Sequence, residues 1–428
     1  MDEFEIRDGE MYCEGVALSA IAGDVGTPVY VYSTASMRRQ ARALQDALLA
    51  LTDPLIAYAV KANPNSAVIA TFAGEGLGAD VVSGGEYRRA IKAGVPADRI
   101  VFSGVGKTAD EMRLALHGGL FQFNVESVEE AEMLSAVAVE MGCIAPMGFR
   151  VNPDVAAGGH AKITTGSAEN KFGIAIGEAP AAYSRAAKLP GLKVQGVAVH
   201  IGSQLTELTP LERAFSRVGE LLEVLRGRAH DIAVADLGGG LGVSYDPALP
   251  PPPSPAEYGA MVSRVTRGWG ARLVFEPGRL MVGNAGVLLT RVIRVKPGAT
   301  DPFVIVDAAM NDLMRPTLYD AWHHIEAVRP GGSRRRANVV GPVCETGDTF
   351  ATGRDMDEVA ADDLVVFRTA GAYAAAMAGT YNSRALTPEV LVDGERWAVV
   401  RPRLEVEELI AGDRLPEWLV GCAAGAKD

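Results

Sequence analysis

The 428-residue sequence has little of what marks a secreted or metal-binding protein. Its four cysteines are widely scattered and none belongs to a C-x-x-C pair, so we expect a reducing compartment rather than a disulfide framework. The six histidines show no metal-ligand spacing, and we therefore predict no metal site. We interpret the adjacent His323 and His324 as structural, because neighbouring residues do not share a helix face.

Long apolar runs and excess positive charge are also absent. No apolar run approaches the ~20 residues of a membrane span, and the acidic stretch MDEFEIRDGEMY lacks the pattern of a signal peptide. We therefore expect a cytoplasmic protein that does not bind membranes. The net charge of -12 argues against nucleic acid as a partner, because its binders gather Lys and Arg on one face. The basic run at 334–336 is interpreted as a solvated loop.

Eight short apolar runs alternate with amphipathic helical stretches over the first 280 residues. They lie at 54–61, 77–83, 99–104, 121–127, 144–153, 194–203, 232–240 and 271–279. This alternation predicts parallel strands joined by helices, and eight such units predict an α/β fold of the (β/α)8 TIM barrel type. Two helix starts carry capping-box spacing, Thr108 with Glu111 and Ser127 with Glu130.

The pattern changes after the eighth unit. Strand-like segments follow one another without long helices between them, and Asp393-Gly394 between apolar runs indicates a hairpin. We predict a (β/α)8 barrel at 36–280 and a mostly antiparallel β domain at 281–428, with residues 1–35 packing on the β domain. The apolar stretch at 27–32 could join either part.

Polar or glycine-rich residues end nearly every predicted strand. Barrel active sites lie at the C-terminal ends of the strands, so a single mouth is expected to carry Lys61, Asp80, Ser83, Glu126, Arg150, His200, Gly238-Gly239-Gly240, Glu276 and Arg279. Lys61 stands out because lysine is almost never fully buried without a partner, and yet it ends an apolar run. Any one of these residues could be an ordinary loop residue. Because nearly every strand ends in this way, the set as a whole favours a functional site.

Two glycine-containing stretches resemble phosphate loops. The sequence GVGKT at 104–108 ends like a P-loop, but Val101 holds the position of the first required glycine, so we predict no nucleotide site there. The sequence LGGGLG at 237–242 fails the dinucleotide pattern because Val243 holds its last glycine position. Exposed backbone N–H groups in a glycine run can bind one phosphate, and barrels often do so after strands seven and eight.

A mouth lysine together with a phosphate loop suggests pyridoxal 5'-phosphate. This cofactor bonds to a lysine amine and acts as an electron sink. Its pyridine nitrogen must stay protonated, and Glu276 could stabilise that cation. His200 could lie flat on the ring, although a hydrogen-bonded core histidine is an equally good interpretation.

These motifs together resemble the alanine-racemase-like, fold type III pyridoxal-phosphate decarboxylases, over nearly the whole chain. The matching stretches are the lysine motif at 58–65, HIGSQ at 200–204, the glycine loop at 237–242 and EPGR at 276–279. The resemblance implies that the cofactor is bound by Lys61, His200, Ser203, Gly239, Gly240, Glu276, Pro277, Gly278, Arg279 and Tyr373.

In the C-terminal half, MNDLMRPTLY at 310–319 and GPVCE at 341–345 are similar to the branch of this family that acts on diaminopimelate. This resemblance implies that the substrate is bound by Arg279, Arg315, Tyr319, Glu345 and Tyr373. It also implies a head-to-tail homodimer with shared active sites, in which Cys344 and Glu345 enter the partner's barrel.

The implied reaction is decarboxylation of meso-2,6-diaminopimelate to L-lysine and CO2, the last step of lysine biosynthesis. Lys61 and Cys344 would be the catalytic residues, with Cys344 returning a proton to the carbon that loses CO2. A substrate with charged groups at both ends needs cations at its distal end, and the arginine fork suits a carboxylate. Two alternatives stay open: a related decarboxylase of D-ornithine, D-lysine or another basic amino acid, and a homologue without turnover. The presence of Lys61, Glu276 and Cys344 together disfavours the second.

Overall fold

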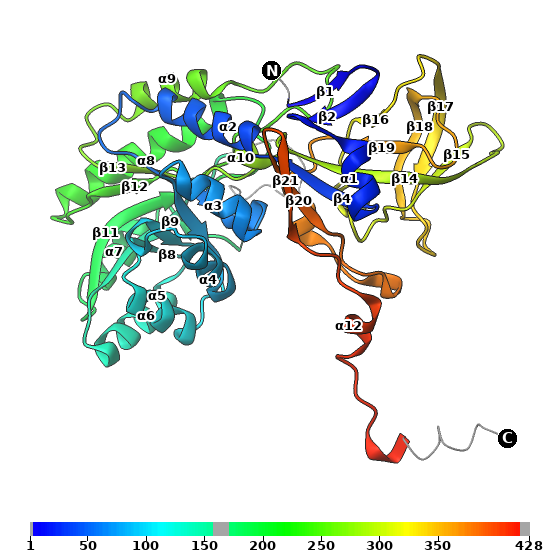
Figure 1. The fold of residues 1–428 in the computed structure, drawn as a ribbon. Helices are drawn as coiled ribbons and strands as arrows, with labels where there is room; N and C mark the ends of the chain where they lie inside the picture. The colour runs from blue at the N-terminus through cyan, green and yellow to red at the C-terminus, as the bar shows by residue number, and fades with distance from the viewer. Residues whose placement is uncertain (1–2, 157–170, 420–428) are drawn as a thin grey trace.

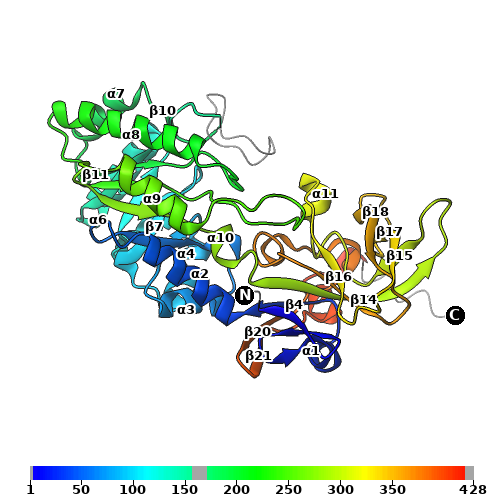
Figure 2. The ribbon, with the colours of Figure 1, turned by 90° about the horizontal axis from the view of Figure 1, so that it is seen from above.

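The computed structural model describes residues 3–156 and 171–419. A barrel with helices around it lies beside a second part made mainly of strands, and the two are joined by several chain segments (Figures 1 and 2). Within the described residues, no helix is long and apolar enough to cross a membrane.

The barrel contains eight parallel strands that follow one another around the ring in chain order, and the last pairs with the first. This arrangement confirms the predicted TIM-type barrel and all eight predicted strands. The strands are β5 (Leu55–Ala59), β6 (Gly78–Val81), β7 (Ile100–Phe102), β8 (Gln122–Val125), β9 (Ala145–Asn152), β11 (Leu192–Val199), β12 (Val234–Asp236) and β13 (Arg272–Phe275). The short β10 (Ile174–Ala175) pairs with β9 outside the ring. β5 to β8 are buried along their whole length, as expected where helices cover a parallel sheet.

The helices of the barrel begin with local capping signals that the sequence partly predicts. Thr108 and Glu111 form the predicted reciprocal capping box. The second predicted box is only half right: Ser127 accepts the Glu130 N–H, but the Glu130 carboxylate binds Lys107 and the Glu126 N–H instead. The helices are α2 (Thr34–Ala47), α3 (Ser66–Gly74), α4 (Gly84–Lys92), α5 (Ala109–Gly118), α6 (Val128–Met141), α7 (Ala179–Ala186), α8 (Thr209–Gly227), α9 (Pro255–Val265) and α10 (Arg279–Val282), with 3-10 turns η1 (Val60–Ala62) and η2 (Ala97–Arg99).

The second part is built around the long strand β14 (Gly286–Lys296). The strand pairings of this second part are antiparallel except for two, β15 with β17 and β20 with β4. The other strands are β15 (Phe303–Val306), β16 (Ile325–Ala327), β17 (Arg334–Val340), β18 (Thr349–Asp357), β19 (Leu364–Phe367), β20 (Glu389–Asp393) and β21 (Arg396–Arg401). Asp393 and Arg396 pair at the end of β20 and β21, which confirms the predicted hairpin.

The N-terminal segment belongs to this second part. β4 (Val29–Ser33) lies between β14 and β20, so the ambiguous stretch at 27–32 contributes to the β domain. The preceding elements are β1 (Phe4–Arg7), β2 (Glu10–Cys13), β3 (Val16–Ala17) and α1 (Leu18–Val25), whose apolar residues pack with those of β4 and β14. The exact boundaries at 36, 280 and 281 remain predictions.

Short elements complete the second part, and one prediction there is wrong. They are α11 (Arg315–Tyr319), η4 (Ala375–Met377), η5 (Tyr381–Ser383) and α12 (Val406–Ile410), which projects from the body (Figure 1). The basic run at 334–336 is not a loop but the exposed start of β17, where its arginines pair with acids such as Asp355 and Asp301.

Candidate active site at the barrel mouth

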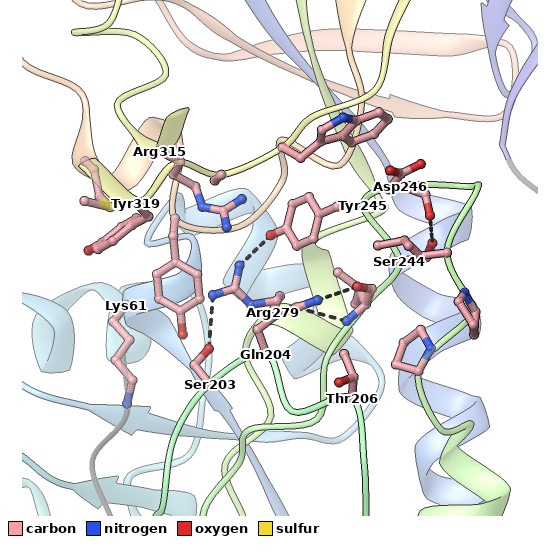
Figure 3. Close-up of a pocket in the computed structure, with 18 of the residues that line it drawn as sticks. Lys61, Ser203, Gln204, Thr206, Ser244, Tyr245, Asp246, Arg279, Arg315 and Tyr319 are labelled. Carbon is pink, nitrogen blue, oxygen red and sulfur yellow. Dashed lines mark hydrogen bonds between the residues drawn. The ribbon is translucent and has the colours of Figure 1, made fainter. Parts of the chain in front are cut away.

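A cavity of about 560 Å³ lies where the barrel mouth meets the β domain. Residues from both parts line it, as the close-up in Figure 3 shows. Seven predicted site residues are among them: Lys61, His200, Ser203, Arg279, Arg315, Tyr319 and Tyr373. Residues that strand-end reasoning missed include Gln204, Tyr245, Asp246 and Trp322.

The β domain reaches the lysine turn through one short segment. The Tyr373 N–H donates to the Ala62 carbonyl at 2.7 Å, and the Asn63 side-chain amide donates to the Gly371 carbonyl at 3.1 Å. Tyr373 adopts a positive φ of 54°, which a non-glycine residue seldom adopts and which clusters at functional sites. These contacts fix the Tyr373 backbone beside the turn that carries Lys61, and both residues line the cavity.

Lys61 lies in η1, directly after β5, so the strand ends two residues earlier than predicted. Its Nζ donates to Asp80 Oδ2 at 2.6 Å, and the other Asp80 oxygen is buried without a hydrogen-bond partner among the described residues. Burial acts to lower the pKa of Lys61, but the carboxylates of Asp80 and Glu276 outweigh it and raise the pKa. The lysine is therefore held as an ammonium while no other group occupies it.

Lys107, from the rejected P-loop, is chemically satisfied. Its buried Nζ donates to the Gly104 and Asn124 carbonyls and to the Glu130 carboxylate, each at 2.7 Å. These three bonds use all three donors of an ammonium group. Lys107 thus links the ends of β7 and β8 and is not available as a nucleophile.

Glu276 follows β13 and is buried against another acid, Asp236 at the end of β12. The Asn124 amide donates to both, at 2.8 Å to Asp236 and 3.2 Å to Glu276, and the Ser103 hydroxyl donates to Glu276 at 3.1 Å. Burial, followed by the charges of Asp236 and Asp80, raises the pKa of Glu276 well above its usual value. Burial raises the pKa of Asp236 as well. The two acids therefore share a proton, which a cation beside Glu276 could replace.

His200 stands between Lys61 and the glycine loop. Its Nδ1 accepts the Gly239 N–H at 3.2 Å, and because a nitrogen that accepts carries no proton, any ring proton lies on Nε2. Burial, together with the charges of Arg150 and Lys61, lowers the pKa of His200 well below its usual value. The imidazole is thus neutral beside these two cations.

The glycine loop cannot accept side chains. A Cβ on Gly239 would lie 2.2 Å from the Glu276 carbonyl, and one on Gly240 would lie 2.6 Å from the Gly202 carbonyl. Gly240 also has a φ of 118°, a region that favours glycine. The loop therefore packs backbone against backbone, and no side chain of its own covers its partly exposed peptide groups.

Two buried arginines lie on the other side of the cavity. Arg279 donates to the hydroxyls of Ser203 (3.0 Å) and Tyr245 (Figure 3). Arg315 donates to His323 Nε2 at 3.1 Å. The premise that His323 lies on a helix is wrong, because it precedes β16 in a non-helical segment. Its ring contacts Arg315, a residue that lines the cavity. The sequence signal that could have found it is its position eight residues after Arg315 and two residues before β16.

The remaining predicted residues have supporting or remote positions. Pro277 accepts the Ala59 N–H at 3.0 Å, and a Cβ on Gly278 would lie 3.1 Å from Ala62 Cβ. Arg150 and Glu126 pair at 3.1 Å, and Ser83 caps α4. Cys344 and Glu345 lie on an exposed loop between β17 and β18 and do not line the cavity of their own chain.

The residues present fit pyridoxal phosphate. Lys61 supplies an amine inside the cavity, the Asp236–Glu276 pair supplies a buried acid that a pyridinium would stabilise, and the backbone loop at Gly239 and Gly240 leaves room for an anion. Among residues 3–156 and 171–419 the buried Asp80 Oδ1 has no hydrogen-bond partner, which is consistent with a site that binds a ligand.

The fold and the site define a class of proteins, the pyridoxal-dependent decarboxylases. The family model of the "Pyridoxal-dependent decarboxylase, pyridoxal binding domain" matches residues 34–283, which include the lysine turn, the glycine loop and the Glu276 motif.

Comparison with individual relatives assigns the chain to one family within this class. The chain is 53% identical to a diaminopimelate decarboxylase of Zymomonas mobilis over 98% of this chain and 100% of the relative, and 51% identical to that of Pseudomonas aeruginosa over 97% and 99%. A crystal structure of the M. jannaschii diaminopimelate decarboxylase in complex with L-lysine superposes with a TM-score of 0.94 at 33% identity, covering 98% of this chain and 99% of that one. The chain therefore belongs to the diaminopimelate decarboxylase family, whose members are carboxy-lyases.

Proposed function

We propose that this chain decarboxylates meso-2,6-diaminopimelate at its D-centre and releases L-lysine and CO2, with pyridoxal 5'-phosphate as cofactor. Family membership over the full length supports this function. The observation that carries it within the site is the pair of buried guanidinium groups of Arg279 and Arg315 in the cavity that also contains Lys61. A substrate that ends in a second carboxylate suits these cations.

Lys61 is the proposed point of cofactor attachment. When bound, pyridoxal phosphate draws electrons away from the bond that releases CO2. Asp80 holds the Lys61 amine at 2.6 Å and so orients it toward the cavity. The Lys61 ammonium must lose a proton to solvent before its amine can react.

Glu276 is proposed to keep the pyridine nitrogen protonated. Ser103 and Asn124 fix one oxygen of its carboxyl group, so its orientation is set before any ligand arrives. His200 would lie against one face of the ring, and Ser203 and the loop at Gly239 and Gly240 would hold the phosphate.

Cys344 and Glu345 are proposed to act in the partner's barrel of a homodimer. Both lie on an exposed loop, outside the cavity of their own chain. Cys344 would return a proton to the carbon that has lost CO2, while Glu345 would bind the distal ammonium group of the substrate. Tyr319 and Tyr373 complete the proposed substrate contacts.

A substrate panel tests the function directly. CO2 release is measured from meso-diaminopimelate, D-lysine and D-ornithine, and the first should be preferred because the other two leave a buried guanidinium without its carboxylate. Truncating one partner of a buried charge pair costs about 2–5 kcal/mol, equivalent to roughly 30-fold to several thousand-fold in kcat/KM. Arg315→Ala should remove most of this preference. Equal turnover of D-lysine or D-ornithine by the unaltered chain would replace the proposal by decarboxylation of a basic amino acid.

A further inference from the structure

The two arginines of the cavity carry charges that the described part of the chain does not neutralise. Arg279 and Arg315 are only 5% and 6% exposed, and within residues 3–156 and 171–419 neither forms an ion pair with a carboxylate. Asp246, which also lines the cavity, acts electrostatically on Arg354. Buried unpaired charges are costly and two like charges repel, so neutral groups must hold this pair in place.

Tyr245 contacts both cations through different parts of one side chain. The Arg315 guanidinium carbon lies over its ring, 4.6 Å from the centroid, where the negative face of the ring attracts a cation. The Arg279 guanidinium donates to the Tyr245 hydroxyl, and its carbon lies 5.7 Å from the same centroid (Figure 3). Tyr245 thus separates the two charges and fixes each of them.

His323 accepts a hydrogen bond from Arg315 and so fixes the position of its guanidinium group. A carbonyl can only accept, so His323 Nδ1 must donate to the Arg368 carbonyl, 2.8 Å away, and Nε2 is left as the acceptor for Arg315. Burial and then the charge of Arg315 lower the pKa of His323 to about 3, so the acceptor survives at any working pH. The His323 ring stands edge-on to Tyr245, at 5.3 Å and 84°.

The remaining contacts of Arg279 are neutral too. Its guanidinium lies over the Tyr373 ring at 4.8 Å and donates to Ser203 at 3.0 Å. Its Nε is buried without a hydrogen-bond partner among the described residues. The set therefore fixes the geometry of both arginines and leaves donor capacity and positive charge for a ligand.

We propose that Tyr245 and His323 are positioning residues that hold Arg279 and Arg315 as a fixed, unneutralised pair, and that this pair selects ligands with a carboxylate at the distal end. The inference rests on the proposed function and extends it, because it assigns the selectivity to two neutral residues behind the arginines. Preorganised cations lose little conformational freedom on binding, which favours affinity.

Two ligands that differ only in the distal carboxylate provide the test. L-lysine carries it and cadaverine, the corresponding diamine, does not. Their dissociation constants for the cofactor-loaded protein are measured by titration calorimetry, and the selectivity is the ratio of the two. The variants are Tyr245→Phe, Tyr245→Leu and His323→Leu. The control is Tyr12→Phe, because Tyr12 lies under an arginine, Arg7 at 5.8 Å, in the N-terminal sheet away from the site.

Tyr245→Phe keeps the ring under Arg315 but removes the acceptor for Arg279, and a hydrogen bond to a charged group is worth about 1.5–3 kcal/mol. We expect it to lower the selectivity roughly tenfold or more, and Tyr245→Leu to lower it further. In turnover, KM for meso-diaminopimelate should rise by a similar factor while KM for D-lysine stays nearly unchanged. The cofactor absorbance of the Tyr245 variants should match that of the unaltered protein. The selectivity of Tyr12→Phe should also equal that of the unaltered protein.

Two different failures can be told apart. In the first, the unaltered protein turns over meso-diaminopimelate, and circular dichroism shows that Tyr245→Phe and Tyr245→Leu are folded, but both variants keep the selectivity for L-lysine. The positioning role is then wrong and the proposed function stands. If the unaltered protein neither prefers L-lysine to cadaverine nor turns over meso-diaminopimelate, the proposed function is wrong and the inference falls with it.

Discussion

The proposed reactivity of Lys61 depends on how its neighbours bind its side chain. The chain offers several lysines near the mouth, but Lys107 is fully hydrogen-bonded between strand ends, whereas Lys61 has one carboxylate partner and a side chain that is 35% exposed. The proposal for Lys61 therefore rests on its solvent access and on its unused hydrogen-bonding capacity, not on its residue type. The P-loop-like motif containing Lys107 has a purely structural explanation.

The first residue-scale prediction concerns this lysine. Lys61→Ala should abolish the absorbance of protein-bound cofactor and the adduct trapped by borohydride, with activity lost by several orders of magnitude. Lys171→Ala is the matched control, since Lys171 is exposed beside Phe172 and its loss should leave the adduct in place. Mass spectrometry that finds the trapped cofactor on Lys171 would contradict the assignment.

The same substitution has a consequence for stability. Lys61→Ala leaves the Asp80 carboxylate buried without its cation, which should lower the free energy of unfolding of the cofactor-free protein by about 1–3 kcal/mol. Adding Asp80→Asn to Lys61→Ala should restore most of that loss, because it removes the stranded charge. Urea unfolding of both variants checks the pair.

At the scale of elements, the barrel brings residues from the ends of four strands into one hydrogen-bond network around Glu276. Ser103, Asn124, Asp236 and Glu276 come from the ends of β7, β8, β12 and β13, and their hydrogen bonds join across the ring. The glycine loop is attached to this network through Gly238, which donates to Asp236 and accepts from the Glu276 N–H. The β-domain segment at Tyr373 is attached to the lysine turn at Ala62. Parallel strands with their carboxyl ends at one face make such convergence general in this fold.

The acid pair in this network predicts a pH dependence. The pKa of Glu276 is raised, so the folded cofactor-free protein keeps a proton that the unfolded chain releases above its ordinary pKa of about 4.3. Stability should therefore fall as pH rises from there through the raised pKa. Glu276→Gln removes the ionisation and should make the cofactor-free protein about 1–3 kcal/mol more stable than the unaltered one near pH 8, while weakening cofactor binding.

Thermal unfolding at pH 5 and pH 8 measures this difference. Glu212→Gln is the control, because Glu212 forms an ion pair with Arg264 on the outside of the barrel and its pKa is lowered rather than raised. A decline with pH that is as steep in Glu276→Gln as in the unaltered protein would show that Glu276 does not hold the proton.

At the scale of the whole molecule, the proposed catalytic residues do not meet within one chain. Lys61 lies in the barrel, while Cys344 lies on an exposed loop of the β domain. A shared site in a homodimer would join them. Mixing inactive Lys61→Ala and Cys344→Ala dimers under exchange conditions should then restore roughly one quarter of full activity, since half the dimers become hybrids with one intact site each.

Two controls make this measurement decisive. Mixing Lys61→Ala with Lys61→Arg should restore nothing, because no hybrid site regains its lysine. Native mass spectrometry verifies that subunits have exchanged. Hybrid dimers without recovered activity would mean that Cys344 does not serve the partner's barrel.

The sequence by itself determined the barrel and most of its mouth. Strand length, helix caps and the polar residues that end each strand are local features, so the eight strands and residues such as Lys61, His200 and Arg279 could be read from short windows. It also determined the hairpin at Asp393-Gly394, because turn chemistry is set by adjacent residues.

Only the tertiary structure decided which of these residues touch. The pairing of Asp236 with Glu276, the placement of β4 between β14 and β20, and the contact of His323 with Arg315 and Tyr245 join positions that no local pattern relates. Side-chain ionisation followed the same rule, since burial and neighbouring charges, not residue type, raised the pKa of Glu276 and lowered that of His323. A one-dimensional pattern records which faces are apolar, whereas the charge and selectivity of a site depend on distances that exist only once the chain has closed on itself.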